Sequence, residues 1–469
     1  MAYIELSYLL AAVCFVFGLK KLSSPRTARA GNCMAALGMF IAIIATLFAK
    51  DTAGVTEIHQ ETLLLILGAI VVGGTLGSVL ALKVKMTAMP QMVALLNGFG
   101  GGASALVAAT VYSQDYASAE GIPPETGVAI QLGAFVGAMT LSGSVVAFGK
   151  LQELLSGRPI TYPLQKTANC ALMLFIVYAA CDLIAKPDTP ELFILLGFAS
   201  LAFGVLFVIP IGGADMPVVI ALLNSFSGLA AAISGFVITN SGLIISGALV
   251  GASGLILTNL MCKAMNRSLA NVLFGAFGGV KKAGSTAEDG DQTITEIQHD
   301  DAAMLMGYAR LVIIVPGYGL AVAQAQHQVR ELAQLLEKAG VEVKYAIHPV
   351  AGRMPGHMNV LLAEADVPYP QLYDMEQVNP EFERADVALV IGANDVVNPA
   401  ARNDTSSPIY GMPILNVDHA ANVIVMKRSM NPGFAGISNR LFFDVKTKML
   451  FGDAKTSLTA LIREVEELT

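Results

Sequence analysis

The first 270 positions of the chain contain nine long apolar runs that few charged residues interrupt. A bilayer core of about 30 Å needs roughly 20 helical residues to cross it, and each run has close to that length. We therefore expect nine membrane-spanning helices. The runs lie at residues 4–22, 33–50, 62–81, 90–112, 127–149, 168–185, 191–210, 216–239 and 241–262.

The pattern changes after the ninth run. Residues 264–300 are polar and rich in Gly and Ser, which is typical of a linker. Beyond them, short apolar runs alternate with amphipathic segments, as in a Rossmann-like α/β domain with a doubly wound parallel sheet. We predict a membrane domain at 1–263 and a soluble domain at 301–469. The expected strands are 310–315, 341–347, 386–391, 413–417 and 422–428, and the expected helices are 320–340, 355–366 and 453–468.

Composition and charge agree with this division. The chain has 469 residues, of which 54% are hydrophobic and 14% charged, too apolar for a soluble protein of this length. Residues 1–270 carry 13 basic and 12 acidic residues, a net charge of +1, and residues 271–469 carry 16 and 24, a net of −8. The five cysteines lie in or beside the apolar runs without a Cys-x-x-Cys, so we expect no disulfide framework and no metal site.

Basic residues predict the orientation of the membrane domain. With the N-terminus outside, the outer loops hold only Lys50 and Lys186. The first run is not expected to be a cleaved signal peptide, because Glu5 and no basic residue precedes its apolar part. The C-terminal domain then lies in the cytoplasm. The inner loops hold Lys20, Lys21, Arg26, Arg29, Lys83, Lys85, Lys150, Arg158, Lys166, Lys263 and Arg267.

Two apolar runs open with the same phrase. "MPQMVALLNGFGGGASA" (89–105) and "MPVVIALLNSFSGLAAA" (216–232) agree at ten of seventeen positions, at an offset of 127 residues. Four runs separate the two copies, so both helices cross in the same direction and the repeat is parallel. Asn97 and Asn224 occupy the same place in the two copies, seven residues after a proline and about 10 Å into the helix.

Two roles are open for these asparagines. They join neighbouring helices by hydrogen bonds, or they line a polar path for water or protons. Small and hydroxyl residues at similar depth favour the path, as do charged residues near the cytoplasmic ends. None of the six histidines falls within an apolar run, so such a path needs a titratable group from elsewhere. The candidate residues of the polar path are Asn97, Asn224, Ser144, Ser253, Gly254, Asp215 and Arg267.

A glycine-containing turn follows the first expected strand of the soluble domain. In "PGYGLAV", Gly317 permits a tight turn and Gly319 lets backbone approach a pyrophosphate at the start of the next helix. Val322 stands where such fingerprints have Gly or Ala, so we expect looser packing between helix and strand. A nucleotide site is indicated, with a plain βα turn as the alternative.

The kind of nucleotide follows from two strand ends. NAD-binding folds usually end the second strand with an acid for the ribose hydroxyls, whereas this strand ends in Ile347 and His348. Lys427, Arg428 and Ser429 follow a later strand and suit a phosphate. Together these features favour NADP, and the alternative for the basic pair is solvated surface charge.

A third segment, "GANDVVNP" (392–399), follows another expected strand at the edge where open α/β sheets bind ligands. Asp395 and Asn398 suit hydrogen bonds to a carboxamide or a ribose. The alternative is the turn-forming chemistry that Asn and Asp share.

The chain resembles the β subunit of proton-translocating NAD(P) transhydrogenase over essentially its whole length. Seven segments carry the resemblance, in the order of the family: "GGADMPVVIALLNSFSG", "MCKAMNRS", "VPGYGLAVAQAQ", "IHPVAGRMPGHMNVLLAEA", "IGANDVVNPAA", "KRSMNPGFAG" and "MLFGDAK". The resemblance implies reversible hydride transfer between NAD(H) and NADP(H), coupled to proton movement. It implies that no side chain acts as a nucleophile or acid, since hydride passes directly between nicotinamides.

The resemblance also implies an inverted NADP(H) on this chain and NAD(H) on a partner α subunit with further membrane helices. The implied cofactor residues are Gly317, Tyr318, Gly319, Val322, His348, Arg353, Asp395, Asn398, Lys427, Arg428, Ser429, Gly433, Phe434 and Asp453. Asn97 stands where some relatives have a proton-path His, which puts proton transport by this subunit alone in doubt. We further expect a dimer of αβ units in lipid, in a bacterial inner membrane, and no nucleic-acid partner. The alternative is an ion transporter or channel gated by a nucleotide-sensing domain, but such sensors usually keep a fuller glycine fingerprint.

Overall fold

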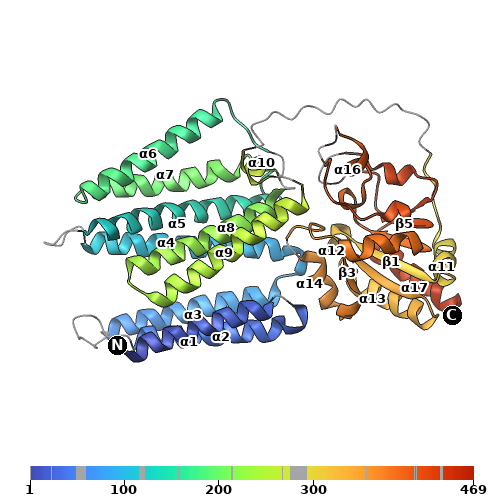
Figure 1. Ribbon diagram of the computed structural model, residues 1–469, viewed down its shortest axis with the longest axis horizontal. Coiled ribbons are helices and arrows are strands. Elements are labelled where there is room, and N and C mark those ends of the chain that lie inside the picture. The colour runs from blue at the N-terminus through green and yellow to red at the C-terminus, as the bar shows by residue number, and fades with distance from the viewer. Residues whose placement is uncertain are drawn as a thin grey trace. The chain divides into compact units, whose positions relative to one another are not determined.

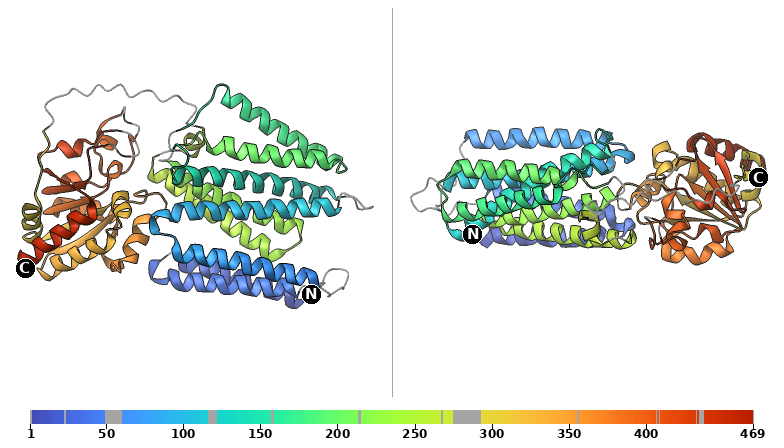
Figure 2. Two further views of the ribbon diagram at one scale, coloured as in Figure 1. Left: turned by 180° about the vertical axis from the view of Figure 1, so that it is seen from behind. Right: turned by 90° about the horizontal axis from the view of Figure 1, so that it is seen from above.

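The protein is described here from a computed structural model (Figures 1 and 2). The chain forms two compact units, one of residues 1–211 and 219–257 and one of residues 212–218 and 258–469. The structure describes residues 2–22, 24–48, 60–115, 122–156, 159–212, 215–266, 268–274, 293–354, 356–405, 407, 409–431, 433 and 437–468.

The described part of the N-terminal half contains nine helices that are long and apolar enough to cross a membrane, so each of the nine apolar runs forms a helix as predicted. Two of them begin as the repeat requires, with Pro90 and Pro217 in the first helical turn, where a missing N–H costs nothing. The helices are α1 (Ala2–Leu22), α2 (Pro25–Leu47), α3 (Gln60–Lys83), α4 (Met89–Asp115), α5 (Pro124–Leu151), α6 (Gln165–Ala185), α7 (Pro190–Val208), α8 (Met216–Val237) and α9 (Ser241–Ala264).

Small residues let these helices approach closely. A Cβ on Gly137 of α5 would lie 2.5 Å from the backbone oxygen of Gly101 in α4, and a Cβ on Gly204 of α7 would lie 2.3 Å from the oxygen of Met139 in α5. Helices without a hydrophobic driving force between them pack by such backbone contacts. Helix α5 therefore packs against both α4 and α7 and is largely buried.

A buried lysine binds backbone carbonyls just after the end of α7. Lys150, near the end of α5, is 3% exposed, and its Nζ donates to the backbone oxygens of Ile209 at 2.5 Å and Ile211 at 2.7 Å. The last carbonyls of a helix have no partner inside the helix and carry partial negative charge. A cation at this point satisfies them and holds the chain that leads from α7 to α8.

The second unit, of residues 212–218 and 258–469, contains the predicted soluble domain and is called the soluble unit below. It is built on a six-stranded sheet with the order β3-β2-β1-β4-β5-β6, in which all paired strands are parallel. This order confirms the predicted doubly wound, Rossmann-like fold. Every residue of β1 is buried, as expected for a parallel strand covered on both faces. The strands are β1 (Leu311–Pro316), β2 (Glu342–Ile347), β3 (Leu372–Asp374), β4 (Val387–Ile391), β5 (Asn422–Lys427) and β6 (Thr447–Phe451).

Helices connect and cover these strands. Helices α13 and α17 pack beside one another on the sheet (Figure 1). The helix expected at 320–340 is two helices, because Gln324 takes a left-handed conformation with φ of +50° and ends the first one. The α-helices of eight or more residues are α11 (His299–Gly307), α13 (Gln326–Lys338), α14 (His357–Glu364) and α17 (Ala454–Leu468), and the shorter ones are α10 (Leu269–Phe274), α12 (Tyr318–Ala323), α15 (Met375–Val378) and α16 (Ala400–Asn403).

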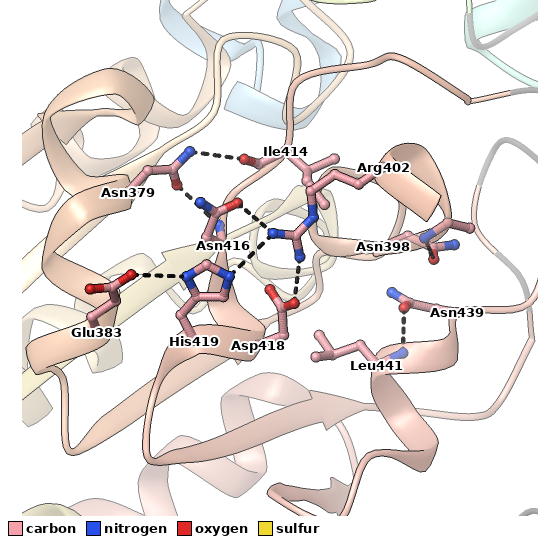
Figure 3. Close-up of polar contacts among 11 residues, drawn as sticks. Asn379, Glu383, Asn398, Arg402, Ile414, Asn416, Asp418, His419, Asn439 and Leu441 are labelled. Atoms are coloured by element: carbon pink, nitrogen blue, oxygen red, sulfur yellow. Dashed lines mark hydrogen bonds and ion pairs between the residues drawn. The ribbon is translucent and has the colours of Figure 1, made fainter. Parts of the chain in front are cut away.

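The strand expected at 413–417 is wrong. Strand β5 pairs directly with β4, and residues 412–416 run beside the sheet without forming a described strand. Side chains and loops satisfy the backbone there instead. Asn379 donates from Nδ2 to the oxygen of Ile414 and accepts at Oδ1 from the N–H of Asn416, both at 3.0 Å (Figure 3).

His348, at the end of β2, ties the same segment to the sheet. It is 2% exposed, its Nε2 lies 2.8 Å from the oxygen of Pro413, and its Nδ1 lies 3.2 Å from the N–H of Val350. The neutral ring with its proton on Nε2 makes both bonds, whereas a doubly protonated ring would point a donor at the Val350 N–H. Burial lowers the pKa of His348 to about 4. The hydrogen bond to Pro413 raises this pKa, but its effect is smaller than that of burial.

This histidine predicts acid sensitivity of the soluble domain. Because its folded pKa of about 4 lies below its usual 6.5, the unfolded chain binds the extra proton first as pH falls. The stabilisation is complete above pH 6.5 and decreases toward pH 4, by at most about 3 kcal/mol. Urea denaturation of a fragment spanning 293–469, at several pH values, measures it.

The matched control is His348→Gln, whose amide can make the same two bonds but does not titrate. We expect the variant to lose less stability than the wild-type fragment between pH 6.5 and 4.5. Equal losses in both proteins would show that other groups cause the acid sensitivity.

Candidate functional site

A cavity opens at the carboxyl ends of β1 and β4, where the strand order changes direction. Open α/β sheets bind ligands at this point. Ten of the predicted cofactor residues line it, and they come from five separate stretches of the chain. The ten are Gly317, Tyr318, Gly319, Arg353, Asp395, Lys427, Arg428, Ser429, Gly433 and Asp453.

Backbone contact between the turn after β1 and the end of β4 forms the floor of this cavity. The N–H of Gly317 donates to the oxygen of Ile391 at 2.9 Å, and that of Gly319 donates to the oxygen of Gly392 at 3.0 Å. A Cβ on Gly317 would lie 2.4 Å from Ala393, and one on Gly319 would lie 2.6 Å from Gly392. Both glycines are therefore required for close approach of two backbones.

This contact changes the expected roles of the fingerprint. Gly317 has an extended backbone, with φ of −129°, so the turn itself does not need a glycine there. The N–H of Gly319 is already donated within the protein. Val322 is 42% exposed, so it does not lie between helix and strand as expected, and Leu320 and Ala321 are buried in its place.

One wall of the cavity is a stack of Arg353 and Tyr318. The Arg353 guanidinium carbon lies 4.4 Å from the centre of the Tyr318 ring, a cation–π distance. The centres of the Tyr318 and His357 rings are 6.1 Å apart, and the two ring planes are tilted by 58°. His357 also accepts the backbone N–H of Arg353 at Nδ1, at 3.1 Å. The loop after β2 thereby presents a cation to the cavity.

The basic residues at the end of β5 differ in how far their side chains are already bound within the protein. Lys427 is half-buried, donates from Nζ to the oxygen of Asn431 at 2.6 Å and lies 4.8 Å from the centre of the Phe442 ring. Burial lowers the pKa of Lys427, although the charge of Asp395 acts in the opposite direction. Arg428 and Ser429 are exposed at the cavity. They are therefore the members of this cluster with side chains available to an anion.

Four predicted cofactor residues are not in this group. Val322, His348 and Asn398 are not among the described residues that line the cavity, and Phe434 lies outside the described residues. Asn398 is fully buried, donates to the oxygen of Ser438 at 3.1 Å and accepts the N–H of Ala400 at 3.0 Å. Its amide therefore has the turn-forming role, the alternative that the sequence left open.

The sequence did not point to several other lining residues, among them Gly352, Gly392, Ala393, Asn394 and Asn431. Gly392, Ala393 and Asn394 belong to the "GANDVVNP" segment, and its place after an expected strand was the available signal. The backbone of Gly392 has φ of +66°, which favours glycine. The other two, Gly352 and Asn431, lie in the loops after β2 and β5.

In the membrane unit, α4 and α8 carry the two asparagines and are joined by polar contacts. Asn97 is 6% exposed, and its Nδ2 donates to the oxygen of Ile220 in α8 at 3.2 Å. Ser227 of α8 donates to the backbone oxygen of Asn97 at 2.8 Å. Asn224 is half-buried, and its side chain has no hydrogen bond among the described residues. The two copies of the repeat therefore use the same amide differently.

The residue after each asparagine contacts the next helix. A Cβ on Gly98 would lie 3.1 Å from Cβ of Ser144 in α5, and a Cβ on Gly254 of α9 would lie 2.7 Å from the backbone nitrogen of Ser225. Each half of the repeat thus packs a serine against a glycine, with the positions exchanged. Ser144 is fully buried, and its Oγ has no hydrogen-bond partner among the described residues.

Three candidates for the proton path remain. Ser253 is exposed on α9, and its Oγ donates to the oxygen of Val250 at 3.0 Å. Asp215 is half-buried immediately before α8. Arg267 lies outside the described residues.

Comparison with known proteins gives the family. Residues 4–464 match the family described as NAD(P) transhydrogenase beta subunit. Curated relatives named NAD(P) transhydrogenase subunit beta, from Rhodospirillum rubrum and from a named strain of it, are each 51% identical over 464 residues, covering 97% of this chain and 98% of the relative. This match favours a transhydrogenase, an oxidoreductase of the membrane, over a nucleotide-gated transporter. The chain belongs to the NAD(P) transhydrogenase beta subunit family.

Proposed function

We propose that this chain binds NADP(H) in the cavity of its soluble domain and exchanges hydride with NAD(H) held by an α subunit. The observation that carries the proposal is the site of the cavity, at the change of strand order, with exposed Arg428 and Ser429 at its rim. A guanidinium and a hydroxyl suit the 2′-phosphate that distinguishes NADP from NAD. The family uses these two cofactors by its name.

The residues of the cavity have different tasks in this proposal. Gly317 and Gly319 hold the ends of β1 and β4 together, and Arg353 supplies a cation above the Tyr318 ring. Asp395 and Asp453 line the cavity from the segments after β4 and β6. Bound nicotinamide supplies the hydride chemistry, and the chain orients it and excludes water. His348 and Asn398 act behind the cavity wall, where they hold the loops in place.

We propose further that hydride transfer is coupled to proton movement through the membrane unit. Asn97, Ser144 and Asn224 form the polar interior of this path, supported by the contacts at Gly98 and by the half-buried state of Asn224. Gly254, Ser253, Asp215 and Arg267 extend it on α9 and toward the cytoplasmic side. The titratable group comes from a helix of the α subunit, since this chain has no histidine in its apolar runs.

The proposed assembly is a dimer of αβ units in the lipid of a bacterial inner membrane. The basic loops support an outside N-terminus and a cytoplasmic soluble domain. We place the functional boundary between the membrane and soluble domains in the linker at 264–300.

The phosphate site predicts cofactor preference. In the full-length chain, Arg428→Ala should lower the affinity for NADPH by roughly 10- to 150-fold and leave that for NADH unchanged, because one charge-assisted contact of about 1.5–3 kcal/mol is lost. Lys427→Ala should cost less, because its Nζ is already held by Asn431. Calorimetry with both cofactors measures this. Lys446→Ala, at an exposed position before β6, is the control, and an undiminished NADPH preference in Arg428→Ala would place the phosphate elsewhere.

The division of labour predicts that the chain is inactive alone. Vesicles with only this subunit should show no hydride transfer from NADPH to an NAD analogue, because the second nicotinamide has no site. Addition of the α subunit should restore the reaction. Turnover by this subunit alone would contradict the proposal.

The asymmetry of the two asparagines predicts a difference between their variants. Asn97→Leu removes a buried bond to α8 and should lower thermal stability, by about 0.6 kcal/mol on average for such bonds. Asn224→Leu removes none and should leave stability unchanged, but it should reduce proton uptake by αβ vesicles, because water in the path loses a partner. Normal uptake by both variants would leave only a structural role for the two residues.

A further inference from the structure

Lys150, at the end of α5, is a buried charge that neither the cofactor cavity nor the polar path uses. Of the charged side chains that the structure describes in the nine membrane helices, only that of Lys150 is buried. Its Nζ donates to the backbone oxygens of Ile209 and Ile211, which follow the end of α7. A charge inside a membrane domain is costly, and such residues are usually retained for a function.

The bond to Ile211 lies at a boundary of the fold. The membrane unit extends to Ile211, residues 212–218 belong to the soluble unit, and the chain returns to the membrane unit at Val219. Helix α8 begins at Met216, so its first residues belong to the soluble unit and the rest to the membrane unit. Lys150 therefore holds the last residue of the membrane unit before the chain that starts α8.

The next residue of α5 holds the other copy of the repeat. Gln91 is buried in the first turn of α4, and its Nε2 donates to the backbone oxygen of Leu151 at 3.2 Å. The end of α5 thus binds the start of α4 directly and the chain before α8 through Lys150. The two copies differ in one respect, because the chain that precedes α4 stays within the membrane unit.

Helix α8 has no free space at its start. Residues 216–223 are all buried, and closely packed interiors transmit a displacement rather than absorb it. Gly143 lies two turns before Lys150 on the same face of α5. A Cβ on Gly143 would lie 3.4 Å from Cδ2 of Leu223, the residue before Asn224. One face of α5 therefore contacts the chain before α8 and also α8 itself, beside the half-buried asparagine.

Resting on the proposed function, we propose that Lys150 is a positioning residue for the coupling of hydride transfer to proton movement. By binding Ile209 and Ile211 it fixes the membrane end of the chain that leads into α8. A change in the soluble unit during turnover then displaces α8, and with it Asn224. Without the ammonium this chain takes up the displacement itself, and hydride transfer proceeds with less proton movement.

The direct test is Lys150→Met in the full-length chain, assembled with its α subunit in vesicles. Methionine has a similar length and no donor. The number of protons moved per hydride transferred should fall by about fivefold or more, since couplings between sites are typically at least that large. Hydride transfer in the presence of an uncoupler and NADPH affinity by calorimetry should be retained. An unchanged ratio would overturn the proposal, whereas a wild-type enzyme that moves no protons during hydride transfer would instead overturn the proposed function.

Gln91→Leu is the matched control. Both variants remove a buried hydrogen bond at the end of α5, but Gln91 holds the copy whose preceding chain stays in the membrane unit. Gln91→Leu should lower the melting temperature and leave the ratio of protons to hydride unchanged. Equal losses of this ratio in both variants would attribute the effect to a loosened helix bundle and refute the positioning role.

Two further substitutions keep the test decisive if Lys150→Met does not assemble with the α subunit. Lys150→Arg keeps a cation with several N–H donors and should retain most of the ratio. Lys150→Gln has a shorter, neutral side chain and should lose it. A normal ratio in Lys150→Gln, or an equally low ratio in Lys150→Arg, would overturn the proposal. Lys83→Met, at the exposed end of α3, should leave the ratio unchanged, and a loss there would refute an effect specific to Lys150.

Discussion

The soluble domain depends on a contact between two backbones. The turn after β1 and the end of β4 approach so closely that Gly317, Gly319 and Gly392 have no room for a side chain. Two N–H···O bonds hold this junction, and the cavity opens directly above it. Because the strand order changes direction here, the loops after β2, β4 and β5 all reach the same place. The glycine fingerprint therefore allows the close backbone contact on which the cavity is built.

The membrane unit also depends on close backbone approach, here between helices that lie in lipid. Helices in lipid gain little from apolar contact with one another, so close approach and hydrogen bonds decide their packing. The two copies of the repeat keep a serine–glycine contact after each asparagine, with the positions exchanged between Gly98–Ser144 and Ser225–Gly254. One amide joins α4 to α8, and the other has no such bond among the described residues. A repeated sequence has thus given two environments, one in which the amide is bonded to a neighbouring helix and one in which it is half-buried without such a bond among the described residues.

The sequence predicted the features that depend on local pattern. Nine apolar runs gave nine helices, and alternating strands and helices gave the parallel sheet. It failed where side chains distant in the chain decide the outcome. Residues 413–417 have the apolar character of a strand, yet His348 and Asn379 bind their backbone and β5 already occupies the place beside β4. The three-residue strand β3 was too short to give a periodic signal.

The same limit applies to the cavity. Motif position indicated Asp395 and Arg428, but it also indicated Asn398, whose amide is used inside the protein, and it passed over Asn394 one residue before Asp395. Which asparagine lines the cavity depends on the partner of each amide, and those partners lie 40 and 45 residues away, at Ser438 and Asn439. The spacing of residues along the chain does not show which amide has a partner inside the protein.

The most direct measurement of the central claim is an experimental density map of the αβ enzyme with NADPH bound. The account predicts NADPH in the cavity above the Gly317–Gly392 junction, with its 2′-phosphate at Arg428 and Ser429. Density for NADPH elsewhere on the chain, or for NAD(H) in this cavity under the same conditions, would contradict it.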